Sequence, residues 1–139
     1  MVYTIIRLCN NSISGLCCIM SSSSLFLRLF HIVIVGALFL YVGIQRTSIP
    51  KWMFPALLVL GIIIVFYHIY KSVIHIQDKK GYWVNLIHIL LIGPLLIYIG
   101  YYGEDTARLY FELLLMSSFA VIGYHGFYLI QDAIAIPSK

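Results

Sequence analysis

Charged residues are scarce in this chain. Of its 139 residues only 10% are Asp, Glu, Lys or Arg, whereas 62% are hydrophobic. A soluble domain carries roughly 25% charged residues, so this chain lacks the polar side chains needed to cover a surface that faces water. The sequence therefore indicates an integral membrane protein, and the net charge of +4 is better explained by orientation in a bilayer than by binding to nucleic acid.

Motifs that carry catalytic chemistry are also missing. The sequence has no glycine-rich phosphate loop, no HExxH metal motif and no TVGYG-like potassium filter. The three cysteines, Cys9, Cys17 and Cys18, lie in the first 18 residues without CxxC spacing, which disfavours a zinc site and a disulfide framework. Cys17 and Cys18 are either inert thiols or an acylation site beside the membrane. We predict no enzymatic activity.

Long apolar runs are what the sequence has instead. Four segments are separable, at about 25–44, 52–74, 82–102 and 108–134. Each has roughly 20 residues or more, enough for a helix to cross a hydrocarbon core of ~30 Å, in which backbone groups must bond within the segment. We therefore predict an all-α membrane protein, a bundle of four transmembrane helices. Residues 1–24 are predicted to form a tail or an interfacial segment, and residues 135–139 a C-terminal tail.

The distribution of basic residues predicts the orientation of the chain. Four spans place the termini and the loop near residue 78 on one side of the membrane. That side carries six basic residues: Arg7, Arg28, Lys71, Lys79, Lys80 and Lys139. The other side carries only Arg46, Lys51 and Arg108. Because basic residues accumulate on the cytoplasmic side, both termini are predicted to be cytoplasmic.

The sequence repeats itself at an offset of 57 residues. Residues 29–71 align with 86–128 without a gap, and 12 of the 43 positions are identical. The informative identities are those of the less common residues: His31/His88, Gly36/Gly93, Tyr41/Tyr98, Gly43/Gly100, Tyr67/Tyr124 and His68/His125. We predict a tandem duplication of a transmembrane hairpin, 25–76 and 77–134. Because each copy crosses the membrane twice, the two copies would form a parallel repeat about a pseudo-two-fold axis along the membrane normal.

Small residues mark the predicted contacts between helices. Glycine lets helix backbones approach closely in lipid, where packing drives association. The predicted packing positions are Gly36, Gly43, Gly61, Gly93, Gly100 and Ser118. On a straight α-helix, Gly36 and Gly43 lie on a different face from His31 and Tyr41. Pro94 is expected to bend the third span.

Four histidines fall inside the predicted spans. His31, His68, His88 and His125 lie one on each helix, at comparable depth in the cytoplasmic half, and could form one layer. They could hold a bis-histidine haem or a divalent metal, or line a proton or ion path. The favoured interpretation is that these histidines form hydrogen bonds between helices and reach the lipid headgroups. No cofactor is therefore expected.

Glu112 is the one carboxylate within a predicted span. Arg108 lies four residues earlier, on the same helix face, so a salt bridge between them is expected. The first copy has Pro55 at the aligned position. Glu112 is therefore not part of the repeated pattern.

Both copies carry the motif H-x4-G-[AP]-L-x-x-Y-x-G, followed by a helix end of the form [FG]-Y-H-x-[FY]. Over residues 29–128 this resembles small, uncharacterised multipass membrane proteins predicted in giant DNA viruses. The resemblance implies a viral or host membrane and no known active site. With the composition it predicts a structural or interaction role, whose partners would be the bilayer, a second copy, or other membrane or virion proteins. The alternatives are a histidine-lined haem or metal bundle and a proton- or ion-conducting channel.

Overall fold

The computed structural model describes residues 25–79 and 81–135, and all regular secondary structure there is helical. Four helical stretches are long and apolar enough to cross a membrane: Leu25–Ser48, Met53–Gln77, Trp83–Asp105 and Arg108–Gln131. The predicted all-α class with four membrane-spanning helices is confirmed, and the protein is a small multipass membrane protein. Three parts of the chain lie outside the described residues: the predicted tail 1–24 with its three cysteines, the single residue Lys80, and residues 136–139.

Two of the four stretches are interrupted helices. The first continues from residues 25–30 through the π-helix η1 (His31–Gly36) and α3 (Ala37–Gln45) to the 3₁₀ turn η2 (Arg46–Ser48). The third consists of α5 (Trp83–Ile87), the π-helix η3 (His88–Ile92), α6 (Gly93–Tyr102) and the 3₁₀ turn η4 (Gly103–Asp105). The other two are continuous: α4 (Met53–Gln77) and α7 (Arg108–Ala135).

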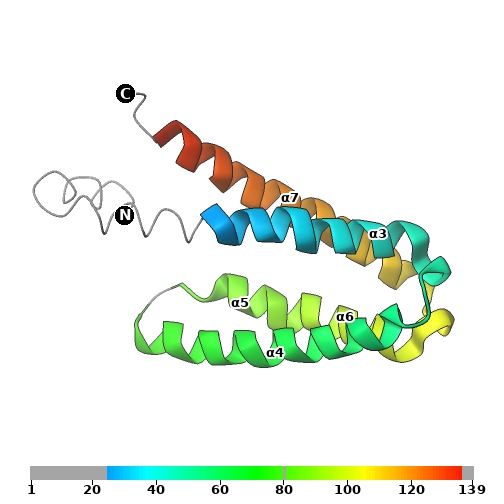
Figure 1. Ribbon diagram of the computed structural model, residues 1–139. Helices are drawn as coiled ribbons and strands as arrows, with labels where there is room; N and C mark the ends of the chain where they lie inside the picture. Colours follow the sequence, from blue (N-terminus) through cyan, green and yellow to red (C-terminus); the bar gives the residue numbers. More distant parts are fainter. Residues whose placement is uncertain (1–24, 80, 136–139) are drawn as a thin grey trace, which may run out of the picture. The chain divides into compact units, whose positions relative to one another are not determined.

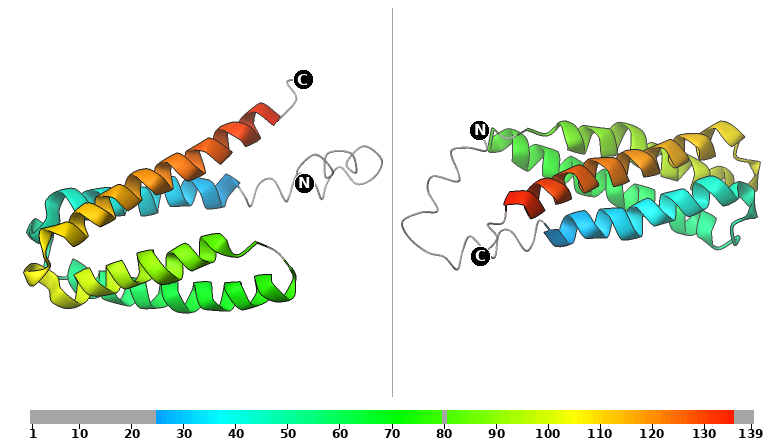
Figure 2. Two further views of the ribbon diagram at one scale, coloured as in Figure 1. Left: turned by 180° about the vertical axis from the view of Figure 1, so that it is seen from behind. Right: turned by 90° about the horizontal axis from the view of Figure 1, so that it is seen from above.

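The chain divides into two compact units. One combines the first helix up to Ala37 with the end of α7 from Ala120, and the other is Leu38–Phe119. In the second unit α4 runs beside α5, η3 and α6 (Figures 1 and 2), and it packs most extensively against α6. The second unit contains a length of each of the four helices. The helices α4 and α6, which pack together in this unit, belong to different predicted hairpins.

The core of the second unit is formed mainly by apolar side chains from all four helices, together with a few buried polar side chains such as those of Asn85 and Ser118. Val42, Leu96, Ile99 and Leu114 are completely buried, and Phe111 is almost so. Burying a side chain of this size stabilises a fold in water by about 1.5–3 kcal/mol. In a membrane that gain is absent, because lipid tails are as apolar as the core, and close packing has to hold the helices together.

Glycines provide this close packing in both units. In the first unit, a Cβ on Gly36 would lie 2.8 Å from Ile122 Cγ1. In the second unit, a Cβ on Gly43 would lie 2.8 Å from Leu115 Cβ. The remaining close approaches, also in the second unit, are Gly61 against Gly93 and Ile97, Gly93 against Val65, and Gly100 against the backbone of Leu58. Ser118, aligned with Gly61, is fully buried and donates a hydrogen bond from Oγ to Leu115 O at 2.7 Å.

Several features recur at the 57-residue offset. The π-helices begin at His31 and His88, and the 3₁₀ turns begin at Arg46 and Gly103, where φ is 53° and 56°. The contacts recur as well, because the partners of Gly36 and Gly93 are aligned with each other, and so are those of Gly43 and Gly100. A duplicated hairpin would give these recurrences, but the duplication itself is still a prediction from the sequence.

The prediction that His31 and Gly36 occupy different helix faces is wrong. His31 stacks on His125 and Gly36 packs on Ile122, both on α7. The reason is η1, since a π-helix bonds i to i+5 and thereby shifts the phase of the residues that follow. The π-helix does not require a proline, because η1 is followed by Ala37 where η3 is followed by Gly93 and Pro94.

Candidate functional site: two imidazole pairs

The four membrane-embedded histidines meet in pairs. His31 and His125 stack in the first unit with ring centroids 4.5 Å apart and ring planes 28° apart. His68 and His88 stack in the second unit at 4.0 Å and 15°. All four side chains are half-buried. Each pair joins two different helices, and the 57-residue offset converts one pair into the other.

Hydrogen bonds at Nδ1 orient three of these rings. His31 Nδ1 donates to Leu27 O at 2.8 Å, and His88 Nδ1 donates to Val84 O at 2.7 Å. Each of these carbonyls belongs to the residue four positions before the histidine, in the helical turn that leads into the π-helix. Because a carbonyl oxygen can only accept, the hydrogen of each neutral ring must lie on Nδ1, and Nε2 carries the lone pair.

Asn85 orients the third ring, and the sequence reasoning missed it. Its Oδ1 accepts a hydrogen bond of 2.9 Å from His68 Nδ1, and its side chain is buried. A single amide within a predicted span was the available signal, because a buried polar side chain in a membrane needs a partner. The aligned residue is Arg28, which donates to Tyr128 O at 2.5 Å.

The four histidines were predicted to form one layer. The structure describes two pairs, one within each unit. Among the described residues no group of three or more His, Cys, Asp and Glu could hold a metal ion. Each pair thus offers two nitrogen ligands at most. The fifth histidine, His75, donates from Nδ1 to Gly81 O at 3.0 Å in the loop after α4 and belongs to neither pair.

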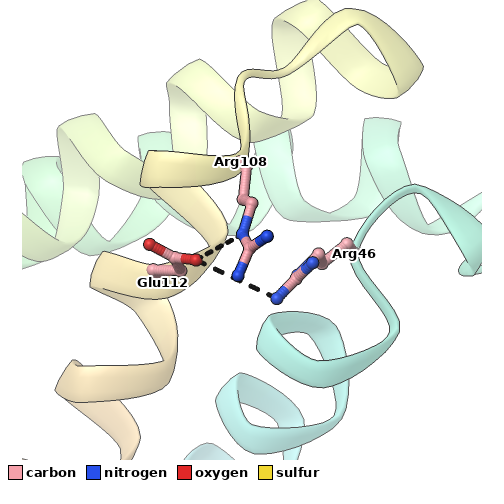
Figure 3. A network of polar contacts seen from close by, with 3 residues as sticks. All are labelled: Arg46, Arg108 and Glu112. Atoms are coloured by element: carbon pink, nitrogen blue, oxygen red, sulfur yellow. Dashed lines mark hydrogen bonds and ion pairs between the residues drawn. The ribbon is translucent and has the colours of Figure 1, made fainter.

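A polar network lies at the opposite end of the second unit. Arg108 Nε lies 2.5 Å from Glu112 Oε1, which is the predicted ion pair, and Arg46 Nη2 approaches the same oxygen at 3.9 Å (Figure 3). Arg46 was not predicted to take part. It comes from the turn after α3, whereas the other two residues belong to α7. Neither Arg46 nor Glu112 is shared between the two copies, because the aligned residues are Gly103 and Pro55.

Tyrosines pack beside this network. Tyr98 of α6 stacks on Tyr110 of α7 with ring centroids 3.9 Å apart, and Tyr102 lies 4.4 Å from Tyr98. On the surface nearby, Lys51 Nζ lies 3.1 Å from Glu104 Oε1. Aromatic rings and exposed ion pairs are typical of the ends of spans, where the bilayer meets water. This end of the second unit can therefore anchor the helices where the bilayer meets water.

Comparison with protein-family models, with curated proteins and with solved structures finds no match to this chain.

Proposed function

We propose that this protein has a structural or interaction role in a membrane, that of a viral particle or of the host cell, and catalyses no reaction. The observation that supports this most is the glycine packing. At Gly36, Gly43, Gly93 and Gly100 even a single added carbon would meet a neighbouring helix within 3 Å. These contacts lie between helices of one chain, and close packing of the same kind also drives association between transmembrane helices.

The lipid-facing surface supports the same role. Large apolar side chains project outward, among them Phe66, Leu90 and Met116, each about 70% exposed. The described charged residues lie at or near the ends of the helices and in their connections. Such a surface suits contact with lipid or with another membrane protein. The viral or host setting is inferred from the H-x4-G motif that both copies share.

Association with a second copy of this chain tests the proposal. Two copies with different tags are produced in one membrane, extracted in mild detergent and purified through one tag. We expect the second tag to be retained. Gly36→Leu and Gly93→Leu should reduce that retention by about tenfold, because overpacking costs about 1–3 kcal/mol and 1.4 kcal/mol is a factor of ten.

The histidine variants are the matched controls. His68→Ala and His125→Ala remove side chains from the same helix contacts without forcing the helices apart. We expect them to retain the second copy at the wild-type level. A wild-type protein that purifies without the second copy would contradict the proposal, and so would histidine variants that lose it as completely as the glycine variants.

A further inference from the structure

The polar network of Arg46, Arg108 and Glu112 has more hydrogen-bond donors than it uses. In the part of the chain that the structure describes, the Arg46 side chain makes no hydrogen bond, and the Arg108 side chain makes one, from Nε to Glu112 Oε1. Beyond the proposed structural role, we propose that Arg46 and Arg108 together bind a phosphate group, that of a phospholipid headgroup at the membrane surface.

The charges of the network are the first argument, because they leave a positive excess. Two guanidinium groups share one carboxylate, since Arg46 Nη2 lies 3.9 Å and Arg108 Nε 2.5 Å from the same Glu112 oxygen (Figure 3). The two positive charges therefore lie close to each other, which is unfavourable where the dielectric constant is low. A phosphate group bound to both arginines would supply the second negative charge.

The other charged side chains of this end leave that excess in place. Glu104 is engaged by Lys51, whose Nζ lies 3.1 Å from Glu104 Oε1. Asp105 forms no ion pair with any residue that the structure describes. Lys51 is therefore a basic residue of the same end that has its own partner, and it serves as the control for the two arginines.

The backbone at Arg46 is the second argument. Its φ of 53° suits glycine, which is the aligned residue at position 103. Arg46 Nε is buried without a hydrogen-bond partner among the described residues, which also costs free energy, and the exposed pair with Glu112 compensates for little of this. Strained residues of this kind cluster at functional sites, ligand clamps among them.

The chemistry of the two side chains fits a phosphate group. A guanidinium is a planar fork with five N–H donors and no acceptor, and it matches the geometry of phosphate oxygens. A phosphodiester has two unesterified oxygens, so both arginines can donate to one group. The side chains of Arg46 and Arg108 are 40% and 71% exposed, which leaves them accessible to a headgroup.

The place of the network along the spans favours a lipid as the source of the phosphate. The turns η2 and η4 follow the first and third spans and pack against each other. Trp52 and Tyr101 are strongly exposed close by in the chain, as aromatic residues are at the membrane–water interface. The headgroup region lies at this depth on either side of a bilayer, so the phosphate groups of lipids are the anions nearest to the two arginines.

Lipid binding by the full chain tests the proposal. The protein is purified in a nonionic detergent and titrated with phosphatidylglycerol, and bound lipid is counted by native mass spectrometry. Diacylglycerol with the same acyl chains is the control lipid without phosphate, and inorganic phosphate is titrated separately by equilibrium dialysis. We expect one phosphatidylglycerol per chain, bound at least tenfold more tightly than diacylglycerol or inorganic phosphate.

Variants identify the groups that bind the phosphate. Arg46→Gly is the most informative, because glycine suits the backbone at this position. We expect Arg46→Gly and Arg108→Gln each to weaken the binding by about tenfold, the usual loss for a hydrogen bond to a charged group. Lys51→Gln, the matched control, should stay within about twofold of the wild-type affinity. Glu112→Gln should bind at least as tightly as the wild-type protein, because it removes the carboxylate that competes for the guanidinium groups.

Several outcomes would overturn the proposal. Diacylglycerol that binds as tightly as phosphatidylglycerol is one, and a wild-type protein that binds neither lipid is another. Equal losses in Lys51→Gln and Arg46→Gly would show a general attraction to charge, and a loss in Glu112→Gln as large as that in Arg108→Gln would show that the network serves folding alone. Inorganic phosphate that binds as tightly as phosphatidylglycerol would support the arginine site and overturn the lipid as its source.

Discussion

Arg46 is the residue at which the backbone and the side chain impose opposite demands. Its φ is 53°, a conformation that glycine adopts readily and other residues reach at a cost of roughly 1–2 kcal/mol. The aligned residue in the second copy is Gly103, with a φ of 56°. The arginine side chain approaches Glu112 at 3.9 Å, but both side chains are about 40% exposed, and a pair of this kind contributes only about 0–1 kcal/mol.

Replacing Arg46 with glycine or alanine separates these two contributions. Both variants lose the approach to Glu112, and only alanine keeps the backbone strain. We expect Arg46→Gly to be more stable than Arg46→Ala by about 1 kcal/mol, measured as unfolding of the detergent-solubilised protein. Neighbouring Gln45 is the control, because its φ is −73°. There alanine should be the more stable of the two, by up to about 1 kcal/mol. The same order at both positions would contradict the strain argument.

At the scale of the helix, packing depends on which glycines lie against a neighbouring helix. Gly100 of α6 lies against the backbone of Leu58 in α4, whereas a Cβ on Gly126 of α7 would meet no described atom within 4 Å. Backbone cannot move aside as a flexible side chain can. The same substitution should therefore have opposite effects at these two positions.

Gly100→Ala should destabilise the protein by about 1–3 kcal/mol, the usual cost of overpacking. Gly126→Ala should be neutral or stabilising by up to about 1 kcal/mol, because alanine favours the helix. Thermal unfolding followed by circular dichroism in one detergent compares both variants with the wild-type protein. If Gly126→Ala were as damaging as Gly100→Ala, glycine would be needed for a reason other than helix approach.

The sequence was enough to predict where the helices lie along the chain, but not which side chains share a helix face. Span limits and packing glycines were predictable because hydropathy and small residues act locally. The pairing of His31 with His125 was not, because it depends on a π-helix that straight-helix phasing omits. The signal was present as a spacing of five residues, from His31 to Gly36 and again from His88 to Gly93. The role of Asn85 depended on which helices become neighbours, and the repeat alone did not specify that.

For the whole molecule, orientation in the membrane is the property that the predicted duplication constrains most. A repeat of two spans returns the chain to the side where it began, so both copies share one orientation. The excess of basic residues is six against three, which predicts that the loop at Asp78 lies on the cytoplasmic side and the turn at Glu104 on the other side. Two of the six residues are the neighbours Lys79 and Lys80.

Cysteine labelling measures this orientation. With Cys9, Cys17 and Cys18 replaced by serine, Asp78→Cys should react with a membrane-impermeant maleimide only from the cytoplasmic side, and Glu104→Cys only from the opposite side. Adding Lys79→Gln and Lys80→Gln reduces the bias to four against three. A mixed population should result, in which each cysteine is labelled from both sides, because basic residues near the spans determine how the chain inserts. Labelling of Asp78→Cys from the non-cytoplasmic side alone, in the protein with all its lysines, would show that the opposite orientation is the correct one.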